Sequence, residues 1–119
     1  MRKILLAALA ATALVPTAAS AQRHNHMAAR GDWRTYRQTH RNVFTRPAFV
    51  WPRGYSYRPL SVGAVLDRLF WGPQYRISYA TYRLPYPGPG REWVRYGNDA
   101  VLISIRTGRV ITVYTDFFY

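Results

Sequence analysis

The chain contains 119 residues and no cysteine, and its formal net charge is +12 because 17 Lys and Arg residues outnumber five Asp and Glu residues. The lack of cysteine excludes disulfide bonds and a cysteine nucleophile. There is no Gly-x-Ser-x-Gly motif, no paired acidic motif, and no histidine from Leu60 onward. We therefore do not expect an enzyme.

The first 21 residues have the pattern of a signal peptide. Arg2 and Lys3 precede an apolar run at residues 4–15 that is too short to span a bilayer, and the small residues Ala19-Ser20-Ala21 follow. We expect cleavage after Ala21 and export of the mature chain. Cleavage lowers the formal charge from +12 to +10 and leaves arginine as the only cationic residue type besides histidine.

The expected export of the chain determines which anionic partners its positive charge could meet. Arginine can bind phosphate or carboxylate through two parallel hydrogen bonds. Inside a cell, such a basic and aromatic chain would indicate nucleic acid, but we do not expect that partner for an exported protein. Anionic membrane surfaces and other envelope polyanions fit better, and a merely solvated charged surface is the alternative. The candidate contacts are Arg23, Arg30, Arg34, Arg37, Arg41, Arg46 and Arg53.

Residues 22–59 show no sustained hydrophobic period. Arginines alternate with aromatic residues, and Pro47, Pro52 and Pro59 interrupt the segment. We expect a basic linker that is largely extended or disordered, although residues 31–43 could form a short helix.

The folded domain is predicted at residues 60–119, starting with a helix. Its apolar stripe has the i, i+3, i+4, i+7, i+8 spacing of a helix face. Ser61 is a suitable N-cap, and Gly72-Pro73 should end the helix. A half-buried strand is predicted at residues 75–79, where apolar and polar residues alternate. The apolar stripe of the predicted helix consists of Val62, Val65, Leu66, Leu69 and Phe70.

The segment from Leu84 to Gly90 contains three prolines and cannot continue a strand ladder. We interpret it as a polyproline-like crossover into Trp93. A proline-rich ligand for an aromatic groove is the alternative.

Residues 91–119 predict an antiparallel meander, because three β-favouring runs are separated by two turn clusters. For the second turn we expect Gly108 in a left-handed bulge, which pairs Ile103 with Ile111 and Val101 with Val113. That register places Val101, Ile103, Ile105, Ile111 and Val113 on one face.

The first turn leaves two registers open. A Gly97-Asn98 loop pairs Val94 with Val101, and a three-residue loop pairs Trp93 with Ile103. The aromatic end of the chain, residues 117–119, should pack against Trp71 or Trp93.

The predicted fold class is α+β. We expect one short helix on an antiparallel meander of about four strands, preceded by the disordered, Arg- and aromatic-rich segment. So small a domain without disulfides has a thin core, so a partner or a second copy could stabilise it.

Several motifs in this domain resemble those of the RcnB-like family. They are Tyr82-Arg83-Leu84-Pro85, Pro87 to Gly90, Trp93 to Ile103 and Arg106 to Ile111, and the ending Val113 to Tyr119 is also similar. The resemblance covers residues 60–119. It implies a non-enzymatic periplasmic accessory protein in nickel and cobalt homeostasis, with a metal ion or a membrane transporter or efflux protein as partner. No cofactor is implied as a requirement.

A candidate metal site follows from the expected cleavage. Gln22, Arg23 and His24 would then begin the mature chain. The α-amine, two deprotonated amides and the His24 imidazole can form a square plane of four nitrogens, which suits Cu(II) and Ni(II). His26 could add a weak ligand. Cobalt is the third candidate metal, on the basis of the resemblance, and cyclisation of Gln22 would abolish the site.

Overall fold

A computed structural model describes residues 32–119. The predicted signal peptide and the candidate ligands Gln22, Arg23, His24 and His26 lie outside these residues, as does Arg30. In chain order the elements are α2 (Trp33–Thr39), α3 (Arg41–Phe44), the 3-10 helices η1 (Arg68–Trp71) and η2 (Pro73–Tyr75), α4 (Tyr79–Tyr82), β1 (Arg91–Tyr96), β2 (Asp99–Ser104) and β3 (Val110–Tyr114). In residues 32–119, no helix is long and apolar enough to cross a membrane.

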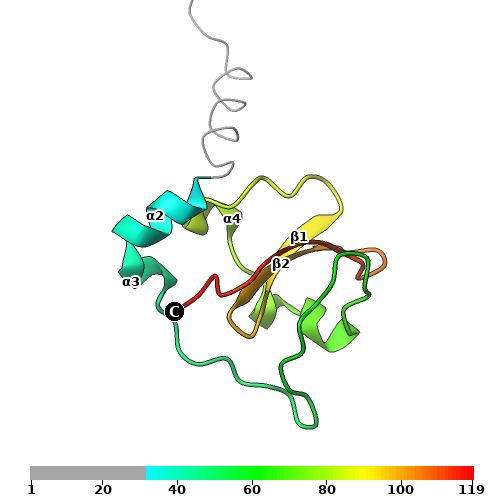
Figure 1. The fold of residues 1–119 in the computed structure, drawn as a ribbon. Coiled ribbons are helices and arrows are strands. Elements are labelled where there is room, and N and C mark those ends of the chain that lie inside the picture. The colour runs from blue at the N-terminus through cyan, green and yellow to red at the C-terminus, as the bar shows by residue number, and fades with distance from the viewer. Residues whose placement is uncertain (1–31) are drawn as a thin grey trace, which may run out of the picture.

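The predicted meander is confirmed, with three strands rather than about four. The strands form one antiparallel sheet in the order β1-β2-β3 (Figure 1). Val94 pairs with Val101, so the first turn is the two-residue Gly97-Asn98 loop. The fold class is therefore α+β, with short helices around a small sheet.

The second turn confirms one predicted pair and corrects the other. Gly108 adopts a positive φ of +75°, and Val101 pairs with Val113 as expected. Ile103, however, pairs with Val110, because the register shifts between Leu102 and Ile103. Ile111 is the extra residue on β3, and its side chain joins the core cluster on the opposite face from Val113. Ile105 is 38% exposed and not part of either cluster.

Both faces of the sheet are covered, each by its own core cluster. Trp93, Ala100 and Leu102 belong to one cluster, and Val94, Val101 and Ile103 belong to the other. The continuous apolar run of β2 explains this arrangement, because a strand buried on both faces does not alternate with polar residues.

The helix predicted from Ser61 does not form. Gly63 has a positive φ of +95°, and Val65 forms an antiparallel bridge with Arg109. The backbone of residues 63–66 instead bonds to residues 108–110, which gives the loop its partners. The apolar stripe is therefore divided: Leu66 and Phe70 are buried, whereas Val62, Val65 and Leu69 are exposed.

The strand predicted at residues 75–79 is also wrong. Arg76 forms a single bridge with Val94, and the Ile77 amide donates to the Trp93 carbonyl at 3.0 Å. The chain then turns into α4, whose first turn is capped by Ser78. The alternation of apolar and polar residues at 75–79 is too short to distinguish a strand from an isolated β-bridge.

Residues 32–59 belong to the folded unit, contrary to the predicted linker and its boundary at residue 60. Trp33 and Phe44 are buried in the same cluster as Trp93, and Figure 1 shows α2 and α3 beside the sheet. Residues 45–50 contain no regular element, but Phe49 and Trp51 pack on the other cluster. Residues 45–50 have no hydrophobic period, and the contacts of Phe49 and Trp51 with the second cluster hold this segment against the domain.

The aromatic end of the chain packs as predicted. Phe117 and Phe118 are buried in the cluster that contains Trp93. The Phe117 ring centroid lies 4.9 Å from that of Trp33, and the Tyr119 amide donates to the Phe44 carbonyl at 3.2 Å. The two ends of the described chain therefore complete one core together.

Phe44→Ala tests whether residues 32–59 are part of the folded domain. Phe44 is fully buried, so we expect a loss of about 3–5 kcal/mol in the free energy of unfolding. Val50→Ala is the matched control, because Val50 is 82% exposed and should change stability by about 0.5 kcal/mol or less. Urea unfolding followed by tryptophan fluorescence measures both, and equal effects would contradict this boundary.

Gly108→Ala tests the second turn. A Cβ at Gly108 would collide with the Trp71 ring and lie 3.0 Å from the Leu66 carbonyl oxygen. We expect a cost of about 3 kcal/mol, since strain at positive φ adds to displacement of the ring. Gly54→Ala is the control: Gly54 also has positive φ but faces open space, so it should cost about 1 kcal/mol. Similar costs would show that Trp71 does not sit on Gly108.

Candidate functional site

The turn between β1 and β2 forms the floor of the candidate site. Gly97 has a positive φ of +62°, and a Cβ there would lie 3.1 Å from the Trp51 ring and 3.2 Å from the Tyr57 ring. Glycine therefore supplies both the backbone conformation and the space for two aromatic side chains. The turn consequently joins residues 51–57 to the sheet.

Arg95 supports this turn from inside the domain. Its side chain is buried, its Nε donates to the Gly97 carbonyl at 2.8 Å, and Nη2 donates to Asn98 Oδ1 at 3.3 Å. The guanidinium carbon also lies 4.9 Å from the Phe118 ring centroid. Burial, followed by the nearby charge of Arg46, lowers the pKa of Arg95 below its usual value. The ring contact and the two hydrogen bonds offset part of this desolvation.

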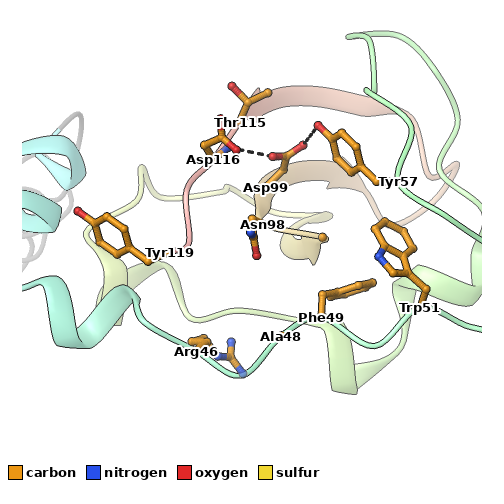
Figure 2. Close-up of a pocket in the computed structure, with 11 residues that line it drawn as sticks. Arg46, Ala48, Phe49, Trp51, Tyr57, Asn98, Asp99, Thr115, Asp116 and Tyr119 are labelled. Atoms are coloured by element: carbon orange, nitrogen blue, oxygen red, sulfur yellow. Dashed lines mark hydrogen bonds between the residues drawn. The ribbon is translucent and has the colours of Figure 1, made fainter.

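Asp99 is a buried carboxylate beside the same turn, with 2% of its surface exposed. Its Oδ2 accepts from the Tyr57 hydroxyl at 2.7 Å, and its Oδ1 accepts from the Asp116 amide at 2.9 Å. Figure 2 shows both bonds converging on Asp99. The hydrogen bond to Asp99, together with burial, raises the pKa of Tyr57 to about 12. Tyr57 therefore stays a neutral donor at physiological pH.

A pocket of about 590 Å³ opens beside these groups. In Figure 2, the Arg46 side chain lies across the pocket from Asp99, and Phe49 and Trp51 form an aromatic wall. The pocket thus combines aromatic surface with a cationic group and two carboxylates. Its lining residues are Arg46, Ala48, Phe49, Trp51, Tyr57, Gly97, Asn98, Asp99, Thr115, Asp116 and Tyr119. This chemistry suits a small amphipathic ligand with both polar and aromatic groups.

Metal-ligating residues do not cluster in the described domain: residues 32–119 contain no group of three or more His, Cys, Asp or Glu side chains that could hold a metal ion. His40 is exposed, its Nδ1 lies 2.8 Å from Thr39 Oγ1, and its ring lies against Tyr36. The predicted ligands Gln22, Arg23, His24 and His26 precede the described residues.

Four predicted polyanion-binding arginines lie over aromatic rings. The guanidinium carbons are 4.4 Å from the Trp33 ring centroid for Arg34, 3.8 Å and 3.9 Å from that of Tyr119 for Arg37 and Arg41, and 5.6 Å from that of Phe118 for Arg46. Arg53 is exposed. Arg37, Arg41 and Arg46 therefore help to hold the C-terminal residues as well as contributing positive charge.

Arg37 also binds the backbone of the C-terminal segment. Its Nε donates to the Phe117 carbonyl at 2.8 Å, and its Nη2 donates to the Asp116 carbonyl at 3.0 Å. Because Asp116 has a positive φ of +52°, the chain bends there, and Arg37 satisfies two carbonyls at the bend. Arg37 is thus a structural residue rather than an unoccupied surface cation.

Arg95, Asp99 and Tyr57 were not identified from the sequence. Arg95 and Asp99 flank a turn, where charged residues are usually solvated. Their burial depends on residues 46–57, which were expected to be disordered. The one available signal was the large number of aromatic residues in that segment, which exceeds that of an ordinary linker.

Tyr57→Phe removes the hydroxyl that donates to Asp99. The raised pKa means that the neutral form is favoured in the folded state, so this stabilisation is present below pH 10 and is lost as pH rises toward about 12. At pH 7 we expect the variant to be less stable by about 1 kcal/mol, given the partial exposure of Tyr57.

Ultraviolet titration of phenolate absorbance provides the measurement. Subtracting the Tyr57→Phe curve from the wild-type curve should isolate one phenol with a pKa of about 12. The same subtraction in an Asp99→Asn background should give a value nearer 10, since the charged acceptor is gone. A wild-type difference curve centred on the ordinary value of about 10 would contradict this hydrogen bond.

Comparison with known proteins adds a family to this geometry. Residues 63–112 match the family model RcnB, described as nickel/cobalt transporter regulator. The matched residues include η1, η2, α4 and the first two strands, and they reach into β3. Neither the curated proteins nor the solved structures give a significant match. The resemblance seen in the sequence is confirmed over residues 63–112, which are similar to a family described as a nickel/cobalt transporter regulator.

Proposed function

We propose that this protein is a non-enzymatic accessory protein of the periplasm that regulates nickel and cobalt transport. The match of residues 63–112 to a nickel/cobalt transporter regulator family is the observation that carries this function. The signal-peptide pattern of residues 1–21 supports export. A membrane transporter or efflux protein is the partner that fits both features.

The metal-sensing part of this proposal lies at the amino terminus of the mature chain. Cleavage after Ala21 places His24 third, where its imidazole, the α-amine and two backbone amides of Gln22-Arg23-His24 can surround one metal ion. Four nitrogens in a plane favour Ni(II) and Cu(II) over Zn(II). Metal binding at this segment would leave the folded domain available for contact with the partner.

His24→Ala tests this metal site. Wild-type protein beginning at Gln22 should develop the visible d–d band of a square-planar nitrogen complex when mixed with Ni(II) or Cu(II). His24→Ala should lose the band, because one of the four nitrogens is removed. His40→Ala is the control and should keep it, since His40 lies on the folded domain beside Tyr36. Absence of the band from wild-type protein with an intact, uncyclised amine would contradict the site.

The regulatory function has a separate test in cells. Cells that lack this protein should change their nickel and cobalt accumulation, measured by elemental analysis, and the wild-type chain should restore it. His24→Ala should fail to restore it if metal binding at the amino terminus is required. Unchanged accumulation of both metals in the deletion strain would contradict the regulatory function itself.

Contact with anionic envelope material is the second candidate function. One observation favours it: residues 58–69 and 105–109 contain both exposed arginines and exposed aliphatic side chains. The arginines between 23 and 53 would add long-range attraction. The protein would then act as a cationic module at an anionic surface.

A further inference from the structure

An exposed aliphatic surface lies where the predicted helix failed to form. Val62, Val65 and Leu69 are 69%, 60% and 50% exposed, and Ile105 is 38% exposed. These four are half of the eight large hydrophobic side chains that are exposed in residues 32–119. We refer to Val62, Val65, Leu69 and Ile105 as the aliphatic surface. Exposed apolar side chains that lie close together can mark a site of contact with a protein or a membrane.

Backbone hydrogen bonds bring the two segments of this surface together. The Leu66 amide donates to the Gly108 carbonyl at 2.9 Å, and the Gly63 amide donates to the Val110 carbonyl at 2.8 Å. Val65 lies opposite Arg109 in an antiparallel bridge. Residues 62–69 therefore run beside the loop that carries Ile105, and the sheet holds both in place.

Exposed arginines accompany the aliphatic surface. Arg68 lies between Val65 and Leu69 in sequence, Arg106 follows Ile105, and all of these side chains are exposed. Arg109 is also exposed, and its Nη1 donates to the Gly63 carbonyl at 2.9 Å. Arg58 lines a pocket together with Val65. Three guanidinium groups thus lie on the two segments that form the surface, and Arg58 adds a fourth from the preceding residues.

Asp67 is the one acidic residue in residues 58–71 and 105–110. Its Oδ1 accepts from the Leu69 amide at 2.9 Å, and its Oδ2 accepts from the Tyr55 hydroxyl at 2.8 Å. These bonds direct the carboxylate to its own domain, where it caps η1. The net charge of the two segments remains positive.

We propose that the aliphatic surface and Arg58, Arg68, Arg106 and Arg109 form a docking surface for an anionic lipid bilayer. The proposal rests on the second of the two functions above and assigns its site. Aliphatic side chains on a folded surface can enter the headgroup region, while arginines bind lipid phosphates. The combination of both in one place distinguishes this surface from the arginines of α2 and α3, which stack on the rings of the C-terminal residues.

Charge also favours lipid over a second copy of this chain. A symmetric dimer through this surface would bring the guanidinium groups of both copies together, with Asp67 already bonded within its own domain. Like charges at an interface cost free energy unless an anion lies between them. An anionic bilayer supplies that countercharge without requiring a complementary protein surface.

Vesicle co-sedimentation tests the proposal with the purified chain that begins at Gln22, because the apolar run of residues 4–15 would itself partition into lipid. The probe is vesicles of phosphatidylcholine with about one quarter phosphatidylglycerol, compared with phosphatidylcholine alone. Val62→Ser, Val65→Ser and Leu69→Ser combined should lower partitioning by about tenfold. Val50→Ser is the matched control, since Val50 is exposed outside the aliphatic surface.

The arginines are tested in the same assay. Arg68→Gln combined with Arg106→Gln should weaken binding to anionic vesicles by about tenfold. Arg41→Gln should have a smaller effect, because Arg41 lies on α3, which belongs to the other side of the sheet (Figure 1). Circular dichroism should show that every variant stays folded.

Three results would overturn the docking surface. Vesicle binding that is equally strong in the triple serine variant would leave the envelope function standing and move its site elsewhere. No binding of wild-type protein to anionic vesicles would overturn both the surface and the envelope function. If the serine variant instead converts a dimer to a monomer in size-exclusion chromatography, the surface is a self-association interface and the lipid proposal is wrong.

Discussion

The carboxylate of Asp99 connects three separate segments at the turn between β1 and β2. It accepts one hydrogen bond from Tyr57, which belongs to the irregular segment before the sheet, and another from Asp116, which follows it. Arg95 adds two bonds to the turn from the preceding strand. A buried carboxylate is costly unless its lone pairs are occupied. Here the donors come from segments that have no regular structure, so Asp99 fixes their position while they satisfy its charge.

The strands could be predicted from the sequence because their information is local. The β-favouring runs and the two turn clusters predicted the meander, and Gly108 predicted the pair Val101–Val113, whereas the first turn was left open between two registers. The bulge at Ile111 was missed, since it depends on how residues 63–66 bond to the far edge of β3. The helix predicted from Ser61 also proved wrong, because residues 63–66 bond to residues 108–110. Its apolar spacing fits a helix, but tertiary hydrogen bonds to residues 108–110 determine the backbone instead.

The candidate pocket could not be predicted because its walls come from a segment without a period. Phe49, Trp51 and Tyr57 are placed by ring contacts, such as the 5.0 Å between the Trp51 and Tyr96 centroids. Such contacts require a distant partner and leave no repeating pattern in the chain. Near the cluster that contains Trp33 and Trp93, an arginine also holds a segment in place: Arg37 donates to two backbone carbonyls and lies over the Tyr119 ring. A count of net charge treats these residues as solvated cations and overlooks their packing.

The closure of the core by both ends of the described chain has a consequence for biogenesis. Arg37 reaches the carbonyl of Phe117 across 80 positions of sequence, and the Phe44 carbonyl accepts from the Tyr119 amide. Contacts of such long sequence separation form only after the intervening chain has been ordered. The ribosome adds residues 117–119 after all the other described residues, so a nascent chain that has not reached them lacks Phe117 and Phe118 of the cluster around Trp93. The cluster around Trp93 can therefore close only after residues 117–119 have been synthesised, so its completion is a late event in the formation of the domain.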